Sequence, residues 1–124
     1  MTPEELADYA LTLPETWEDE PFGPGVLVYK VAGKMFAILS GPAPGQPGRV
    51  TLKCDPGLAL HLREQYAAVT PGYHTNKRHW NTVLLDGSVP ADELREMVDH
   101  SYAQVIAGLR KADRERLTLL HRQD

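Results

Sequence analysis

A run of thirteen residues, PGYHTNKRHWNTV at 71–83, concentrates side chains that can bind an anionic or aromatic ligand. Its Lys-Arg pair can contact phosphates, and the rings of Tyr73 and Trp80 can stack on bases or on sugar faces. The side chains of His74 and Asn76 can supply hydrogen bonds, and an asparagine amide can read a base edge. We therefore take this run as the candidate binding surface.

Two placements within the run have competing explanations. Lys77 and Arg78 lie between a Pro-Gly turn and an apolar strand, which predicts that both are exposed at or near a hairpin tip. Phosphate contact is one hypothesis for them, and simple exposure to solvent is the other. Trp80 can stack on a ligand or anchor the core on the side of Thr82 and Leu84, and we favour the buried placement.

The other reactive side chains do not form a catalytic or metal-binding pattern. His74 and His79 would lie on opposite faces of a strand, with no acidic residue or cysteine close by in sequence. His100 and Ser101 would point about 100° apart on a helix, so Ser101 is better explained as a small residue at a close helix–sheet contact. Cys54 is expected to be an inert thiol. We expect a protein that is not an enzyme and needs no metal or cofactor.

Three lysines in or beside predicted strands offer a further candidate surface: Lys30, Lys34 and Lys53. If they share one face of a sheet, they form a ridge that attracts anions. Lysines on the open face of an antiparallel sheet also keep that face soluble and discourage edge pairing, and this role needs no ligand. The sequence leaves both explanations open.

Charge is unevenly distributed along the chain. The net charge of −4 argues against a typical basic nucleic-acid binder. However, residues 1–20 contain seven carboxylates and no Lys or Arg, whereas residues 21–80 contain seven Lys or Arg and two carboxylates. This asymmetry can focus anions on one face, or it can reflect an acidic helix that complements a basic sheet.

The composition is that of an ordinary globular protein, with 42% hydrophobic and 24% charged residues. A length of 124 residues is most simply one domain spanning 1–124, in which 110–124 is a possible helical extension. The single cysteine excludes an intrachain disulfide and fits a reducing compartment. Neither a signal core nor an apolar run of membrane-spanning length is present, so we expect a soluble cytoplasmic protein with no membrane partner.

Periodicity and turn signals predict the element order α-β-β-β-α-β-β-α. A capping box at Thr2 begins a helix over 3–13, and residues 16–25 form a connector that turns around Phe22. The remaining predicted elements are strands at 26–31, 34–39 and 49–54, a helix over 55–65, strands at 66–70 and 79–85, and a long helix from Pro90. Strands joined by tight turns favour an antiparallel sheet with helices packed on one face, an α+β fold.

Several short segments together carry a family resemblance. They are PFG at 21–23, VYKVAGKMFA at 28–37, LK at 52–53, PGYHTNKRHW at 71–80 and SY at 101–102. In this order, across nearly the whole chain, they resemble the MmcQ/YjbR family. Each segment alone is a weak signal, but the set is specific in aggregate.

The resemblance implies a small α+β domain with a five-stranded antiparallel sheet, similar to CyaY-like or secretion-chaperone-like folds. It also implies DNA binding, on the basis of a proposed double-wing arrangement of strands. The leading hypothesis is a non-catalytic DNA-binding or regulatory module, and the alternative is an adaptor that binds a protein or a small anionic ligand through its sheet face. The candidate nucleic-acid-binding or anion-binding residues are Lys30, Lys34, Lys53, Tyr73, His74, Asn76, Lys77, Arg78 and Trp80.

Overall fold

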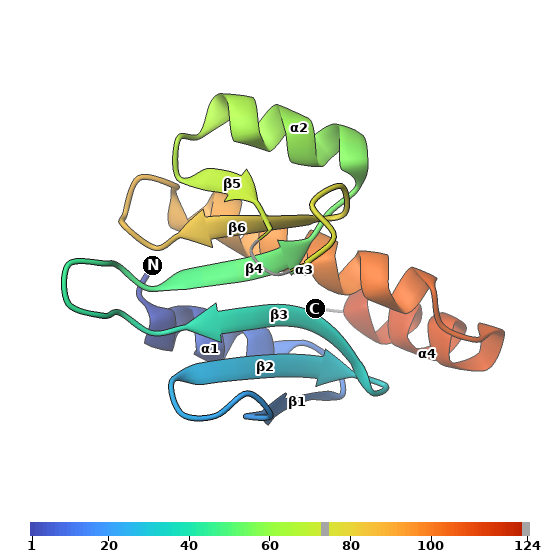
Figure 1. Cartoon of the computed structure of the whole chain (residues 1–124). Helices are drawn as coiled ribbons and strands as arrows, with labels where there is room; N and C mark the ends of the chain where they lie inside the picture. The colour runs from blue at the N-terminus through green and yellow to red at the C-terminus, as the bar shows by residue number, and fades with distance from the viewer. Residues whose placement is uncertain (73–74, 123–124) are drawn as a thin grey trace.

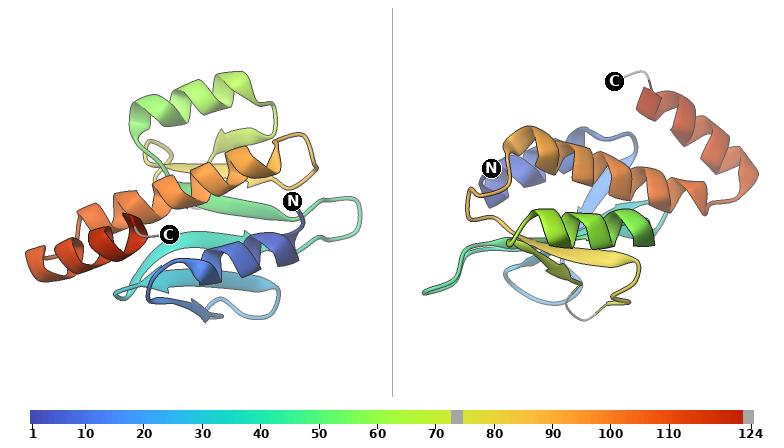
Figure 2. Two further views of the ribbon diagram at one scale, coloured as in Figure 1. Left: turned by 180° about the vertical axis from the view of Figure 1, so that it is seen from behind. Right: turned by 90° about the horizontal axis from the view of Figure 1, so that it is seen from above.

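The computed structural model describes residues 1–72 and 75–122, and it has an α+β fold with one sheet and one layer of helices (Figure 1). Six strands form an antiparallel sheet in the order β1-β2-β3-β4-β6-β5. Helices α1, α2 and α3 cover one face of the sheet, and α4 packs against α3 (Figure 2). Within the described ranges no helix covers the opposite face, which we call the open face.

The elements run from an N-terminal helix through the sheet to a C-terminal pair of helices. Their bounds are α1 Pro3–Thr12, β1 Thr16–Asp19, β2 Val26–Val31, β3 Lys34–Ser40, β4 Arg49–Lys53, α2 Pro56–Gln65, β5 Val69–Pro71, β6 Trp80–Leu84, α3 Ala91–Ala107 and α4 Lys111–Arg122. None of the helices in the described part of the chain has the length and apolar character needed to cross a membrane.

Local signals in the sequence explain where these elements begin and turn. The Thr2 hydroxyl accepts the Glu5 N–H at 3.1 Å and the Glu5 carboxylate accepts the Thr2 N–H at 3.0 Å, which is the expected capping box. The Asp55 carboxylate caps α2 by accepting a backbone N–H from its first turn at 3.1 Å. Ala32 and Gly33 both have positive φ, 50° and 79°, so the predicted two-residue hairpin between β2 and β3 is confirmed.

Strand alternation separates the core from the open face. On β2, Leu27 and Tyr29 face the helices whereas Val28 and Lys30 face away, as the alternation predicts. The core lies between the sheet and the helices, and its largest fully buried side chains are Tyr29, Tyr102, Phe36, Leu6, Leu94 and Leu117. Because side chains of α1, α3 and α4 all contribute to this core, the helical layer fixes the position of the sheet.

Two expectations about the elements are wrong. Residues 16–19, expected in a connector, form β1, which pairs with β2 and makes the sheet six-stranded instead of five-stranded. This segment, TWED, has one apolar residue, so its strand state depends on pairing with β2 and not on periodicity. The fifth strand occupies Val69–Pro71 instead of 66–70. The charged tail, which the sequence left open as a helical extension, is helical, and it forms a separate helix, α4, because α3 ends at Gly108.

Candidate functional site

The open face, which is turned toward the viewer in Figure 1, is built from cross-strand rows of alternate residues. One row is Val26, Ser40, Arg49 and Leu84; the next is Val28, Ile38, Thr51 and Thr82; a third brings Lys30 beside Met35 and Lys53 beside Trp80. Strands β2, β3 and β4 carry no carboxylate and four cations, Lys30, Lys34, Arg49 and Lys53. Three of them lie in these rows, whereas Lys34 pairs with the core residue Val31 at the end of the sheet. The centre of the sheet is therefore basic.

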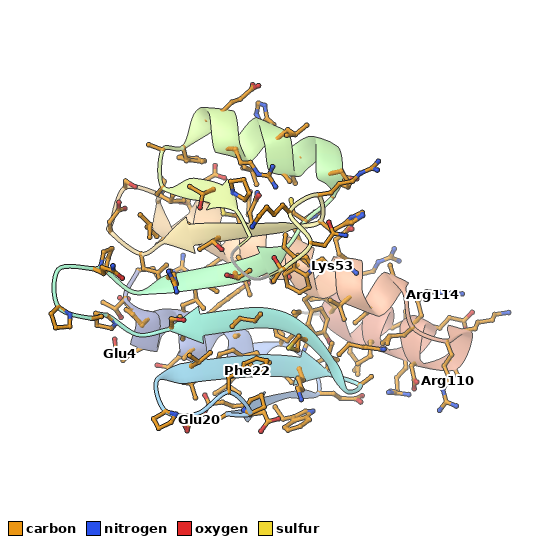
Figure 3. The ribbon with its side chains drawn as sticks, viewed as in Figure 1. Glu4, Glu20, Phe22, Lys53, Arg110 and Arg114 are labelled. Carbon is orange, nitrogen blue, oxygen red and sulfur yellow. The ribbon has the colours of Figure 1, made fainter. Side chains whose placement is uncertain are left out.

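A cavity of about 440 Å³ lies on this face, and we call it the sheet cavity. Its lining is Phe22, Val26, Met35, Ile38, Ser40, Arg49, Thr51 and Thr75. Phe22 belongs to the loop before β2, is 62% exposed, and lies in front of the sheet in Figure 3. The turn that was expected to close around Phe22 as an apolar anchor therefore leaves its ring available at the cavity wall.

A second hollow, of about 330 Å³, lies at the end of the sheet, and we call it the lysine–tryptophan hollow. It is lined by Lys34, Met35, Lys53, Trp80, Val105, Gly108 and Leu109. The structure thus brings two of the three predicted lysines together with Trp80. Lys30 is apart from them: its ammonium lies 3.1 Å from an Asp19 carboxylate oxygen and 5.1 Å from the centre of the Trp17 ring. The hydrogen bond from Lys30 also holds the pKa of Asp19 below its usual value.

The expected burial of Trp80 in the core is wrong. Trp80 lies on the same side of β6 as Thr82 and Leu84, as parity requires, but that side is the open face. The core side of β6 carries Asn81 and Val83, which line the space beneath α2 and α3. Alternation decides which residues share a side, but it does not decide which side the helices cover.

The turn at 75–79 holds several predicted binding residues in hydrogen bonds of its own. The Lys77 ammonium donates to the Gly72 carbonyl at 2.9 Å, and the Asn76 side-chain oxygen accepts the Arg78 N–H at 3.0 Å. Lys77, Asn76 and Arg78 are all exposed. The predicted roles of Tyr73 and His74 fall outside the described residues.

The residue that organises this turn, Arg63 of α2, was not anticipated. Its guanidinium donates to the Asn81 side-chain oxygen at 2.7 Å, to the Trp80 carbonyl at 3.3 Å, and to the Lys77 carbonyl. Asn81 is buried and donates in turn to the Ala59 carbonyl at 3.3 Å. Arg63 therefore connects α2 to the turn and to β6, because a guanidinium has several N–H donors and can bond several oxygens at once. Only its position in the fold reveals this role, because it is eighteen residues from Asn81.

Ser101 fixes the position of Lys53. Its hydroxyl accepts the Lys53 N–H at 2.8 Å and donates to the Phe36 carbonyl. Phe36 is the residue that the β2–β3 register skips, because Tyr29 pairs with Ala37 and Lys30 pairs with Met35. The hydroxyl thus provides hydrogen-bond partners for the carbonyl at this irregularity in β3 and for the N–H at the end of β4. The explanation of Ser101 as merely small is incomplete.

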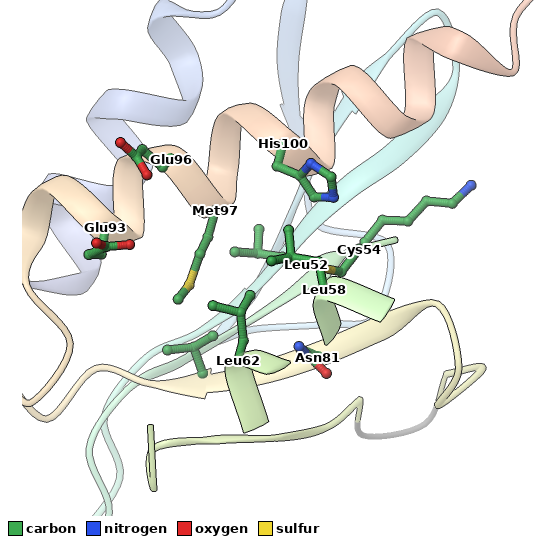
Figure 4. A pocket seen from close by; sticks show the side chains of 11 residues that line it. Leu52, Cys54, Leu58, Leu62, Asn81, Glu93, Glu96, Met97 and His100 are labelled. Atoms are coloured by element: carbon green, nitrogen blue, oxygen red, sulfur yellow. The ribbon is translucent and has the colours of Figure 1, made fainter. Parts of the chain in front are cut away.

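A smaller cavity of about 250 Å³ lies between α2, α3 and the core side of the sheet (Figure 4). Cys54 and His100 both line it, but burial raises the pKa of the Cys54 thiol to about 11 and lowers the pKa of His100. The Nε2 atom of His100 already accepts the Asp55 N–H at 3.1 Å. A protonated thiol beside an engaged imidazole is a poor nucleophile. The described residues also contain no group of three or more His, Cys, Asp or Glu arranged to hold a metal ion.

The comparisons with known proteins agree with the resemblance seen in the sequence. The profile of the YjbR family matches residues 11–104. The chain belongs to the YjbR family. Two Escherichia coli relatives in this family are the uncharacterized proteins YbdF, 38% identical over 87% of each chain, and YjbR, 36% identical over 97% of this chain and all of that one.

Solved structures of similar proteins share this fold. The Deinococcus radiodurans protein DR2400, described by a DUF419 domain, superposes with a TM-score of 0.85 and is 38% identical over 94% of this chain and 88% of its own. A Pseudomonas syringae protein superposes with a TM-score of 0.73 and is 29% identical over 82% of this chain and 96% of its own. The α+β architecture around the open face is therefore common to these proteins.

Proposed function

We propose that this protein is a non-catalytic module that binds nucleic acid, preferentially a single DNA strand, across the open face of its sheet. The observation that carries this proposal is the separation of charge between the two faces. Lys30, Arg49 and Lys53 lie on the open face and Lys34 lies at its end, whereas α1 and α3 have seven carboxylates and one cation, Arg95. Phosphates would be attracted to the open face and repelled from α1 and α3.

Aromatic side chains on the same face favour a single strand over a duplex. Trp17 and Phe22 are 47% and 62% exposed, and Trp80 lines the hollow that contains Lys34 and Lys53. Bases of a single strand can stack on such rings while cations contact the backbone between them. A duplex hides its bases in the stack and would use only the cations.

The test is fluorescence anisotropy of labelled single-stranded and double-stranded DNA over a series of salt concentrations. The variant Lys34→Glu/Lys53→Glu reverses two charges in the lysine–tryptophan hollow. Its matched control, Arg114→Glu/Arg122→Glu, makes the same change of charge on α4 (Figure 3). If the two lysines contact phosphates, the hollow variant reduces the slope of log affinity against log salt by about 1.4 for a single strand, while the control leaves it nearly unchanged.

Three results would count against the proposal. Absence of single-strand binding at low salt, where electrostatic attraction is strongest, would remove it. Equal weakening by the hollow variant and the α4 control would show that net charge matters and the open face does not. Tighter binding of duplex than of single strand would contradict the role given to the aromatic rings.

A further inference from the structure

The sheet cavity has the size and lining of a site for a small planar ring. Its volume of about 440 Å³ lies within the range of about 300–1,000 Å³ that is usual for small-molecule sites. Phe22, Met35 and Ile38 provide an aromatic ring, a polarisable thioether and a branched aliphatic surface around it. Such walls suit the flat faces of a heteroaromatic ring.

Polar groups converge on the same cavity and can read the edge of such a ring. Ser40, Arg49, Thr51 and Thr75 all line it. The Thr75 hydroxyl oxygen is itself buried and packs against Gly72, so it does not open into the cavity. The polar side chains left for the edge of a ligand are those of Ser40 and Arg49.

The sheet cavity and the lysine–tryptophan hollow are neighbours. Met35 lines both of them, and in the hollow it lies with Lys53 and Trp80. A ring in the cavity would therefore place an attached phosphate toward Arg49 or toward the lysines of the hollow. A ring joined to a phosphate is the chemistry of a nucleotide.

We infer that the sheet cavity binds one unstacked nucleobase, carried either by a free nucleotide or by a single strand lying across the open face. The ring packs between Phe22, Met35 and Ile38, and its polar edge meets the part of the wall formed by Ser40 and Arg49. The strand-borne case rests on the proposed nucleic-acid-binding function. The free-nucleotide case does not, so it tests the cavity by itself.

The experiment uses the methionine methyl groups of the full chain as reporters in ¹H–¹³C spectra, with adenosine 5′-monophosphate as the probe. Met35 lines the sheet cavity, whereas Met97 lines the smaller cavity beneath α2 and α3. The nucleotide is expected to shift the Met35 signal with a Kd of about 10 μM to 1 mM, and to leave Met97 unshifted. Ribose 5-phosphate, which has the phosphate but lacks the ring, is expected to leave both signals in place.

Two variants test the contacts. Ile38→Trp fills the cavity and should weaken nucleotide binding at least about tenfold, whereas Leu60→Trp places the same residue at a site on α2 that is 59% exposed and should have no effect.

Each outcome decides between the two proposals. A nucleotide that shifts Met97 alone, or shifts neither methionine, overturns the cavity inference, as does undiminished nucleotide binding by Ile38→Trp. If Ile38→Trp binds single strands as the unchanged chain does while Lys34→Glu/Lys53→Glu does not, the proposed function stands and the cavity inference fails. If the nucleotide binds and DNA does not, the cavity inference stands for free nucleotides and the proposed function fails.

Discussion

Replacing Ser101 by alanine tests whether one hydroxyl joins α3 to the two central strands of the sheet. Ser101 is fully buried, accepts the Lys53 N–H at 2.8 Å and donates to the Phe36 carbonyl. Neither group has a cross-strand partner in the β2–β3 or β3–β4 register. Ser101→Ala would leave the Lys53 N–H and the Phe36 carbonyl without a hydrogen-bond partner, in a position that bulk water does not reach.

The size of the effect follows from these two groups. A buried backbone group left without its hydrogen bond costs about 1–3 kcal/mol, so two of them predict a loss of roughly 3 kcal/mol in the free energy of unfolding. With a urea m-value of about 1–3 kcal/mol per molar, the unfolding midpoint should fall by at least about 1 M. A serine in a merely tight space would tolerate alanine, which is smaller, with little loss.

Urea unfolding followed by circular dichroism measures this difference. The matched control is Ser88→Ala, which removes an exposed hydroxyl that donates to Asp86 at 2.6 Å, and it should change the free energy of unfolding by less than about 0.5 kcal/mol. If Ser101→Ala and Ser88→Ala have the same midpoint, the Ser101 hydrogen bonds do not carry the helix–sheet contact and the reasoning fails.

Three further predictions concern the Cys54–His100 cavity and the turn before β6. Because burial lowers the pKa of His100, the unfolded chain binds a proton more readily, so stability should fall as pH drops below about 6.5, and His100→Gln should reduce this fall in urea titrations. If the unchanged chain and His100→Gln lost stability equally as the pH fell, the role given to His100 would be contradicted. With a pKa of about 11, Cys54 should react with a thiol reagent at pH 8 on the order of 200-fold more slowly than in the unfolded chain, and equal rates would show that the thiol is not shielded. Gly72→Ala would bring a Cβ to 2.7 Å from the Trp80 Cβ and 3.0 Å from its carbonyl oxygen, so it should lower the free energy of unfolding by about 1–3 kcal/mol; an unchanged thermal midpoint would show that the turn can yield.

Much of the architecture could be predicted because its signals are local. The capping box at Thr2, the Asp55 cap of α2 and the positive-φ pair at Ala32 and Gly33 each act over a few residues. Alternation on β2 likewise placed Tyr29 and Lys30 on opposite sides. Such features depend on neighbouring residues alone, so the sequence displays them completely.

The candidate site was predicted only in part because its contacts are long-range. The lysines of β3 and β4 were identified, but their meeting with Trp80 depends on the β4–β6 register. Arg63, whose guanidinium holds the turn before β6, gives no signal in a helix with polar neighbours. Phe22 became a candidate only once its exposed ring was seen at the wall of the sheet cavity.

The sequence by itself indicated the family, through the resemblance of several short segments taken together. It also determined the α+β class and the basic character of the strands, because these follow from residue types and short-range periodicity. The tertiary structure alone decided which side of the sheet the helices cover. That choice put Trp80 on the open face beside Lys53 instead of in the core, and left Asn81 and Val83 on the buried side. The physical reason is that a strand has two faces of equal periodicity, and only the summed burial of the whole sheet against its helices selects between them.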